Sequence, residues 1–154
     1  TRTDYALRPG VSESWEKSGV ISVYMTVDPD SIKKCDIRQS VDVCGHRFQD
    51  AYGNSDFYEI RGWVLFHRHD TLRYKKGVLL ERNGEYILFR CPDMYREDTA
   101  EAFPKERHAG MSGFIARIDS RVLERDALYT VQPVLIRGRN KIYKGEDACQ
   151  IRTI

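Results

Sequence analysis

The pattern of apolar and polar positions along the chain predicts a protein made almost entirely of short β-strands. The segment Val20 to Val27 is rich in β-branched and aromatic residues and ends at an Asp-Pro-Asp turn, as a strand closed by a turn does. Ile37 to Val43 alternates in part and indicates a second strand, and residues 47–56 are expected to form a polar loop. Phe57 to His67 is the most apolar segment and carries apolar side chains on both faces. It is therefore predicted to be a strand that is covered on both faces or bent at Gly62.

The second half of the chain contains the clearest local signals. Asn83-Gly84 separates two β-rich runs and predicts a type I′ hairpin, because both central residues of that turn need a positive φ. Asp98 to Phe103 is a short helical turn at best, and Pro104 ends it. Leu128 to Arg137 is predicted to be a strand, in which Pro133 favours an edge position or a bulge.

These elements indicate an all-β fold with about seven to nine short strands and at most one short helix. We predict an antiparallel β-sandwich, Ig-like or jelly-roll-like, with a barrel as the second choice. Residues 1–19 have no clean period and are interpreted as a linker or N-terminal arm, within which Trp15 is expected to dock. Residues 20–154 would then form a single β-sandwich domain.

Length and charge exclude several classes of function. The 154 residues include 25 Lys and Arg and 23 Asp and Glu, a net charge of +2. This balance argues against a nucleic-acid partner and against an electrostatic membrane anchor. No apolar stretch approaches the roughly 20 residues of a transmembrane segment. The chain shows no signal-peptide pattern. Because it starts at Thr1 and not at Met, we expect a processed or excised piece of a larger parent protein.

The four cysteines have wide and irregular spacings, and no CxxC pair occurs. A zinc site made of four thiolates is therefore not expected. Up to two disulfides fit the count, but a domain of this size does not require them. We expect free thiols and a reducing compartment. The cysteines are Cys35, Cys44, Cys91 and Cys149.

No GxSxG, HExxH, P-loop or GxGxxG motif is present. His67 and His69 form an i, i+2 pair beside Asp70, which on a strand would point both imidazoles to one side and could begin a metal site. A solvated strand end is the preferred interpretation, because no third ligand is placed by the sequence. A catalytic pair with Cys91 as the nucleophilic thiol and His108 as its base is likewise disfavoured. We predict no catalytic residue, no metal and no cofactor.

Aromatic side chains suggest a ligand, since the chain has nine Tyr, six Phe and two Trp. Sugars present flat C–H faces on which aromatic rings stack, while nearby polar groups bind the hydroxyls. Core packing is the preferred interpretation for Trp63, which lies mid-strand, whereas Tyr95 lies in a polar loop. For Arg96 the preferred interpretation is structural, with Arg96 and Asp98 tying this connection to the sheet by salt bridges and backbone hydrogen bonds. The candidate carbohydrate-binding residues are Tyr95, Arg96, Asp93, Trp63 and Tyr58.

Three segments together resemble a known family. They are residues 60–64 (IRGWV), residues 96–103 (REDTAEAF), and residues 112–118 (SGFIARI) followed by 128–131 (LYTV). Their order is similar to that in a β-sandwich accessory domain found beside the catalytic domains of bacterial glycosyltransferases of cell-surface polysaccharide synthesis. The resemblance implies a noncatalytic module that positions the enzyme or engages glycan. It supplies no established binding residues.

We therefore expect an accessory domain of a bacterial glycosyltransferase or surface-polysaccharide assembly protein. Its partner would be a glycan or its own catalytic domain, and its location the cytoplasm, at the inner face of the membrane through the parent protein. The alternative is a docking or dimerisation module, in which an edge strand at residues 128–137 could pair, although Pro133 works against this. A small metal-dependent hydrolase that uses His67, His69 and Asp70 is the third hypothesis.

Overall fold

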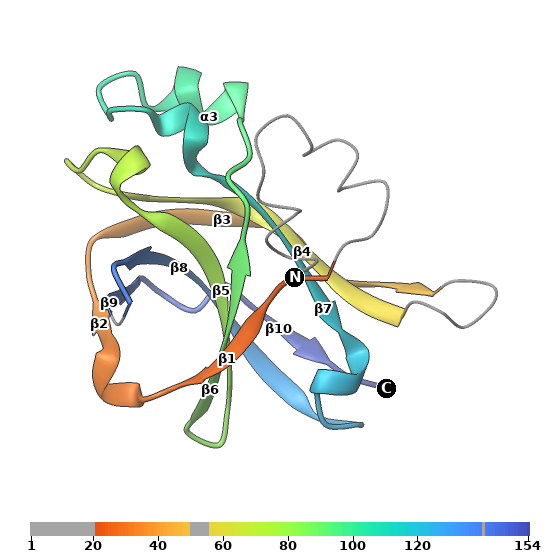
Figure 1. The fold of residues 1–154 in the computed structure, drawn as a ribbon. Coiled ribbons are helices and arrows are strands. Elements are labelled where there is room, and N and C mark those ends of the chain that lie inside the picture. The colour runs from red at the N-terminus through yellow and green to blue at the C-terminus, as the bar shows by residue number, and fades with distance from the viewer. Residues whose placement is uncertain (1–20, 50–55, 140) are drawn as a thin grey trace.

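A computed structural model describes residues 21–49, 56–139 and 141–154, and it confirms the all-β class (Figure 1). Ten strands form two sheets in this part of the chain, one strand more than the predicted range, and the single α-helix is short. No helix in the described ranges has the length and apolar character needed to cross a membrane. The predicted arm at residues 1–19, with Trp15, lies outside the described residues.

The strands are β1 (Tyr24–Val27), β2 (Ile32–Lys34), β3 (Ile37–Gln49), β4 (Asp56–Phe66), β5 (Lys75–Arg82), β6 (Glu85–Cys91), β7 (Gly113–Asp119), β8 (Leu128–Arg137), β9 (Lys141–Lys144) and β10 (Cys149–Arg152). The helical elements are α3 (Glu97–Ala102) and the 3-10 turns η1 (Pro29–Ser31), η2 (Thr71–Arg73), η3 (Ala109–Ser112) and η4 (Ser120–Val122).

The main core lies between the two sheets. One sheet has the order β1-β6-β5-β8-β9-β2, with β10 also paired to β8, and the other has the order β3-β4-β7. Because side chains alternate along a strand, the even positions Ile60 and Val64 of β4 enter this core, as Val78 and Leu80 of β5 do. The odd positions of β4 face the other way.

A smaller core lies on the other face of the larger sheet, where Val27 and Ile32 pack against Leu79 and its neighbours. β1 and β2 occupy opposite edges of this sheet, yet only residues 28–31 separate them in the sequence. The five peptide units from Val27 to Ile32 span at most ~18 Å. In a flat sheet of six strands, the two outer strands would lie ~24 Å apart. The sheet therefore curls around this second core, and Figure 1 shows the chain passing from β1 through η1 to β2.

Two local predictions on the strands are confirmed. Asn83 and Gly84 have φ values of 55° and 78°, as the hairpin between β5 and β6 requires. β4 is buried on both faces over most of its length. Gly62 is needed there for close approach, since a Cβ at this position would lie 2.2 Å from the carbonyl oxygen of Ser40 on β3.

The expected end of the second strand and the expected polar loop from residue 47 are corrected by the structure. β3 continues to Gln49 and pairs with β4 along its length. The register shifts between Val41 and Val43 and again between Cys44 and His46. Such bulges interrupt the alternation of side chains, so the apolar pattern stops before the strand does.

The edge position expected for the strand at residues 128–137 is wrong. β8 pairs with β5 on one side, and with both β9 and β10 on the other. β10 reaches Val131 and β9 begins opposite Val134. Pro133 is accommodated because it lies at the interval between these two partners, where the ladder on that side is interrupted. β8 therefore lacks the free edge through which the sequence suggested that this strand could pair with another chain.

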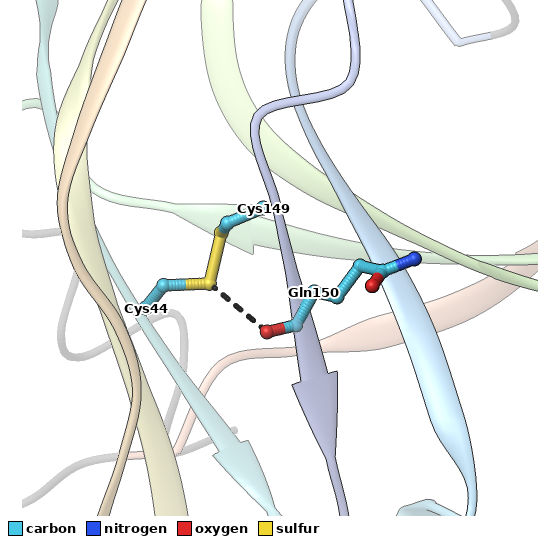
Figure 2. The surroundings of a disulfide bond; sticks show 3 residues. All are labelled: Cys44, Cys149 and Gln150. Carbon is cyan, nitrogen blue, oxygen red and sulfur yellow. Dashed lines mark hydrogen bonds between the residues drawn. A yellow bond between two sulfur atoms is a disulfide. The ribbon is translucent and has the colours of Figure 1, made fainter.

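A disulfide joins the two sheets. Cys44 of β3 is bonded to Cys149 of β10, with a Cα–Cα distance of 6.7 Å and a sequence separation of 105. Figure 2 shows the bond crossing between the two strands, with the carbonyl oxygen of Gln150 3.8 Å from Cys44 Sγ. Because a disulfide sulfur carries no proton, this approach is a contact and not a hydrogen bond. The expectation of free thiols is wrong for this pair and holds for Cys35 and Cys91.

Candidate functional site

A groove of about 600 Å³ lies between the edge strand β3 and the connection from β9 to β10. Residues 37–41 of β3 form one wall, and residues 146–148 form the other. Trp63 of β4 and Phe103, which follows α3, contribute the aromatic surface. The groove thus combines segments that are far apart in the sequence.

The β3 wall is fixed by its inward-facing residues. Ile37 and Val41 pack against the main core, which holds the backbone of this edge strand in place. Arg38 and Ser40 alternate with them and are exposed. Charged and polar residues on an edge strand discourage unspecific pairing with other chains, and here they also place hydrogen-bonding groups at the groove.

The opposite wall is held against β3 by two contacts. Gly145 lies so close to Ile37 that an added Cβ would be 3.0 Å from the Cβ of Ile37. Gln39 donates a hydrogen bond from Nε2 to the carbonyl oxygen of Glu146, with a distance of 2.5 Å. The Oε1 atom of Gln39 is buried and has no hydrogen-bond partner among the described residues.

The same wall is also anchored to β8. The backbone N–H of Ala148 donates to the carbonyl oxygen of Val131 at 2.9 Å. Gln132, a buried residue of β8, donates from Nε2 to Asp147 Oδ1 at 2.6 Å. The disulfide at Cys149 follows directly. The wall is therefore a built feature of the fold and not a free loop.

The aromatic surface of the groove comes from Trp63 and Phe103, whose ring centroids are 5.2 Å apart at an interplanar angle of 58°. Trp63 occupies an odd position of β4 and points away from the main core, while Val64 beside it is fully buried. The expectation that Trp63 packs in the core is therefore corrected, since the side chain is only partly buried. Phe103 is placed by the end of α3, where its N–H donates to Thr99.

The charged residues that line the groove are Arg38, Glu146 and Asp147, one positive and two negative, a net charge of −1. Glu146 forms an ion pair with Lys34 at 3.0 Å, and both side chains are exposed. Arg38 contacts Asp36 at 3.4 Å, again at the surface. Exposed pairs of this kind contribute little and exchange readily with other partners, so these groups are available to a ligand.

Arg96 has the structural role that was the preferred interpretation from the sequence. Its guanidinium forms two hydrogen bonds with Asp98, at 3.0 and 2.6 Å, and a further ion pair with Asp42 of β3. The hydrogen bond from Arg96 lowers the pKa of Asp98. Arg96 thus ties the segment before α3 to the smaller sheet.

Tyr95 is exposed, as expected, and lies outside the residues that line the groove. Its ring covers Gly110, where an added Cβ would lie 2.6 Å from Tyr95 Cε1. The residue therefore packs against η3 on one side and faces solvent on the other. Tyr95 and Trp63 do not form a shared aromatic platform in the groove.

Asp93 faces a buried cation that the sequence did not reveal. Lys76 of β5 is fully buried, and its Nζ lies 3.1 Å from Asp93 Oδ1. The same Nζ donates to the carbonyl oxygens of Thr71 and Tyr74 at 3.4 and 3.3 Å. Burial lowers the pKa of Lys76, and the nearby carboxylate of Asp93 counteracts part of this shift. Asp93 is therefore engaged in a structural ion pair.

Tyr58 is buried and faces the main core from the far end of β4. Five residues of a strand separate it from Trp63 by ~17 Å. Its hydroxyl accepts a hydrogen bond from the N–H of Ile154 at 3.3 Å, and the guanidinium of Arg47 lies 5.7 Å from its ring centroid. Of the five predicted binding residues, Trp63 alone lines the groove.

The histidines do not converge on a common point. His67 contacts Glu106 at 2.7 Å, His69 contacts the hydroxyl of Tyr74 at 3.0 Å, and Asp70 contacts His108 at 2.8 Å. In the part of the chain that the structure describes, no group of three or more His, Cys, Asp or Glu is arranged to hold a metal ion.

The thiol of Cys91 is buried, and burial raises its pKa. Its Sγ lies 3.7 Å from the carbonyl oxygen of Phe89, while His108 is paired with Asp70. A raised pKa keeps a thiol protonated, and the thiolate is the nucleophilic form. The arrangement therefore offers no support for a cysteine–histidine catalytic pair.

The sequence signal that could have located the groove is weak. Residues 145–148 are a short polar connection, and Gln39, Gln132 and Asp147 belong to no motif. Their proximity depends on β9 and β10 pairing with the same side of β8. Comparison with known proteins adds no assignment, because no family model, no curated protein and no solved structure matches this chain.

Proposed function

We propose that the chain is a noncatalytic accessory domain that binds carbohydrate in the groove between β3 and residues 146–148. The observation that supports this is the partly buried ring of Trp63, set beside Phe103 and next to a row of polar groups. An aromatic surface flanked by a few hydrogen-bonding groups is typical of sites for small polar ligands. A pyranose ring can stack on such a surface while its hydroxyls reach Arg38 and Asp147.

The proposed parent is a bacterial glycosyltransferase or another protein of surface-polysaccharide assembly. This part of the proposal rests on the resemblance of the Gly-Trp, Arg-Glu-Asp and Gly-Phe segments. In the structure these segments lie on β4, at the start of α3 and at the start of β7. The domain would present a glycan to, or position, the neighbouring catalytic domain.

A cytoplasmic location at the inner face of the membrane stays part of the proposal. The disulfide between Cys44 and Cys149 weighs against it, because cytosolic thiols are generally kept reduced. The redox state of this pair in the native host, measured by alkylation of freshly lysed cells, would decide the compartment.

A titration of the isotope-labelled protein with glycans, followed by two-dimensional amide NMR, tests the proposed site. We expect saturable shifts confined to residues 37–41, Trp63 and residues 146–148. Trp63→Ala should weaken binding about fivefold or more, since ring contacts of this type are worth roughly 1 kcal/mol. Tyr95→Ala removes an exposed aromatic ring outside the groove and should leave the affinity unchanged. Unchanged spectra with every glycan would contradict the proposal.

Docking to another protein is the second candidate function. It is favoured by the edge strand β1, where Tyr24 and Met25 are 52% and 45% exposed, and by Val23 directly before this strand, which is 38% exposed. Apolar side chains on an edge strand are a common basis for pairing with another chain. A mass that rises with protein concentration, and that Met25→Lys returns to the monomer value, would support this candidate over glycan binding.

A further inference from the structure

The geometry points to Asp147, held in place by Gln132, as the group that selects the ligand of the groove. The selected ligand is a sugar unit that donates hydrogen bonds through hydroxyl or amino groups, and acidic sugars are disfavoured. This inference rests on the proposed carbohydrate-binding function and assigns its substrate class.

Gln132 is an unusual residue for its position. It lies within β8, an interior strand, and is only 3% exposed. Its Nε2 donates to Asp147, whereas its Oε1 is buried without a partner among the described residues. A buried amide with an unpaired oxygen costs folding free energy. This hydrogen bond holds the exposed carboxylate of Asp147 on the groove wall in one orientation.

The groove presents Asp147 as an oriented acceptor, beside the donor groups of Arg38 and Ser40. Asp147 uses Oδ1 for Gln132, which leaves its second oxygen as an acceptor, because an ionised carboxylate only accepts hydrogen bonds. The donor group of Gln39 is committed to the backbone of Glu146. A ligand that complements Asp147 must itself supply a donor, which sugar hydroxyls and protonated amino groups do.

The charges that line the groove also disfavour acidic sugars. The groove is lined by Glu146 and Asp147 against Arg38 alone. The carboxylate of an acidic sugar would approach these two like charges, of which Glu146 is paired with Lys34 and Asp147 has no cation beside it. Because these groups are exposed, salt screens the repulsion, with a Debye length of ~30 Å at ~0.01 M and ~8 Å at ~0.15 M salt. Discrimination against acidic sugars should therefore be largest at low salt.

The test compares three ligand classes on the whole chain by amide NMR. The neutral probes are maltohexaose, cellohexaose and the hexamer of N-acetylglucosamine, the amino probe is the hexamer of glucosamine, and the acidic probes are oligogalacturonate and oligoglucuronate. The tightest neutral or amino probe is expected to bind about fivefold or more tighter than either acidic probe at ~0.01 M salt, and this ratio should shrink at ~0.15 M.

Three variants separate orientation from charge. Asp147→Asn should weaken binding of the best neutral probe about tenfold and reduce its advantage over acidic probes, because one negative charge is lost. Gln132→Leu should weaken neutral binding similarly but leave the salt-dependent repulsion of acidic probes in place, because Asp147 is still charged. Adding Gln132→Leu to Asp147→Asn should cause little further loss. Asp126→Asn, at a carboxylate that is 91% exposed and outside the groove, is the matched control.

The outcomes are distinguishable. If no glycan binds the wild-type chain, the proposed function fails and the selectivity inference fails with it. If glycans bind but acidic probes bind as tightly as neutral ones, or if Asp147→Asn behaves like Asp126→Asn, the inference alone is overturned. The amide spectrum of each variant shows directly whether it is folded. A Gln132→Leu protein that is unfolded leaves the decision to Asp147→Asn, whose side chain is on the surface.

Discussion

Replacing Cys44 and Cys149 together by serine is expected to lower the free energy of unfolding by about 4–5 kcal/mol. The bond closes a sequence separation of 105 residues, and the chain-entropy estimate for a loop of this length is about 4.7 kcal/mol. It also joins β3 to β10, which belong to different sheets. The measurement is urea unfolding of the oxidised wild type and the double variant under identical conditions.

The matched control for this experiment is Cys35→Ser. Cys35 is a free, partly buried thiol near the start of β3, and its replacement should change stability by less than about 1 kcal/mol. Reduction of the wild type should reproduce the loss seen in the double variant. Equal stability of oxidised wild type, reduced wild type and double variant would show that the bond does not restrict the unfolded chain as argued.

Lys76→Met is expected to lower the free energy of unfolding by about 3 kcal/mol, the lower end of the range for removing one member of a buried ion pair. The substitution leaves the carboxylate of Asp93 and the carbonyl oxygens of Thr71 and Tyr74 without the cation that they contact. Asp93 is 28% exposed, so water relieves part of the cost. Lys75→Met, on the exposed neighbour in β5, should be nearly neutral.

A second substitution shows whether the loss comes from the unpaired charge. Lys76→Met combined with Asp93→Leu should recover much of the stability, because replacing both members of a buried pair by apolar residues is often neutral. If the double variant is as unstable as Lys76→Met, packing around the lysine stem and not the orphaned carboxylate is responsible.

The pH dependence provides a further check on Lys76. Its pKa in the folded protein lies below the ordinary value of 10.5, so the unfolded chain binds more protons over the interval between the two values. Stability therefore rises with pH across that interval. The difference in stability between wild type and Lys76→Met should grow as the pH approaches 10.5, and a difference that stays constant or shrinks would contradict a depressed lysine pKa.

Local sequence patterns predicted those elements whose conformation depends on neighbouring residues. The hairpin at Asn83-Gly84 follows from the need for positive φ at two adjacent positions. The apolar run in β4 predicted burial on both faces, which the structure confirms. The all-β class follows from the same short-range signals. The salt bridge between Arg96 and Asp98 could also be predicted, since the two residues are close in the sequence.

Pairings between distant segments could not be predicted from local sequence patterns. The bulges in β3 broke its alternation, so its end was misplaced, and Pro133 suggested an edge in a strand that is internal. The predicted binding residues were chosen by residue type, and three of them, Asp93, Arg96 and Tyr58, proved to be engaged in structural contacts. Trp63 was the exception among the predicted binding residues. It lines the groove with Phe103 and residues 146–148 and stays partly accessible.

By itself the sequence determined the β-rich class, the turns and the faces of the apolar strands, because these follow from backbone preferences and from periodicity along the chain. The tertiary structure decided which cysteines are joined, which lysine is buried and where Gln132 meets Asp147. Each of these depends on strand order and register between segments far apart in the sequence. Side-chain spacing carries no information on that order, so the groove emerged only once the sheets were assembled.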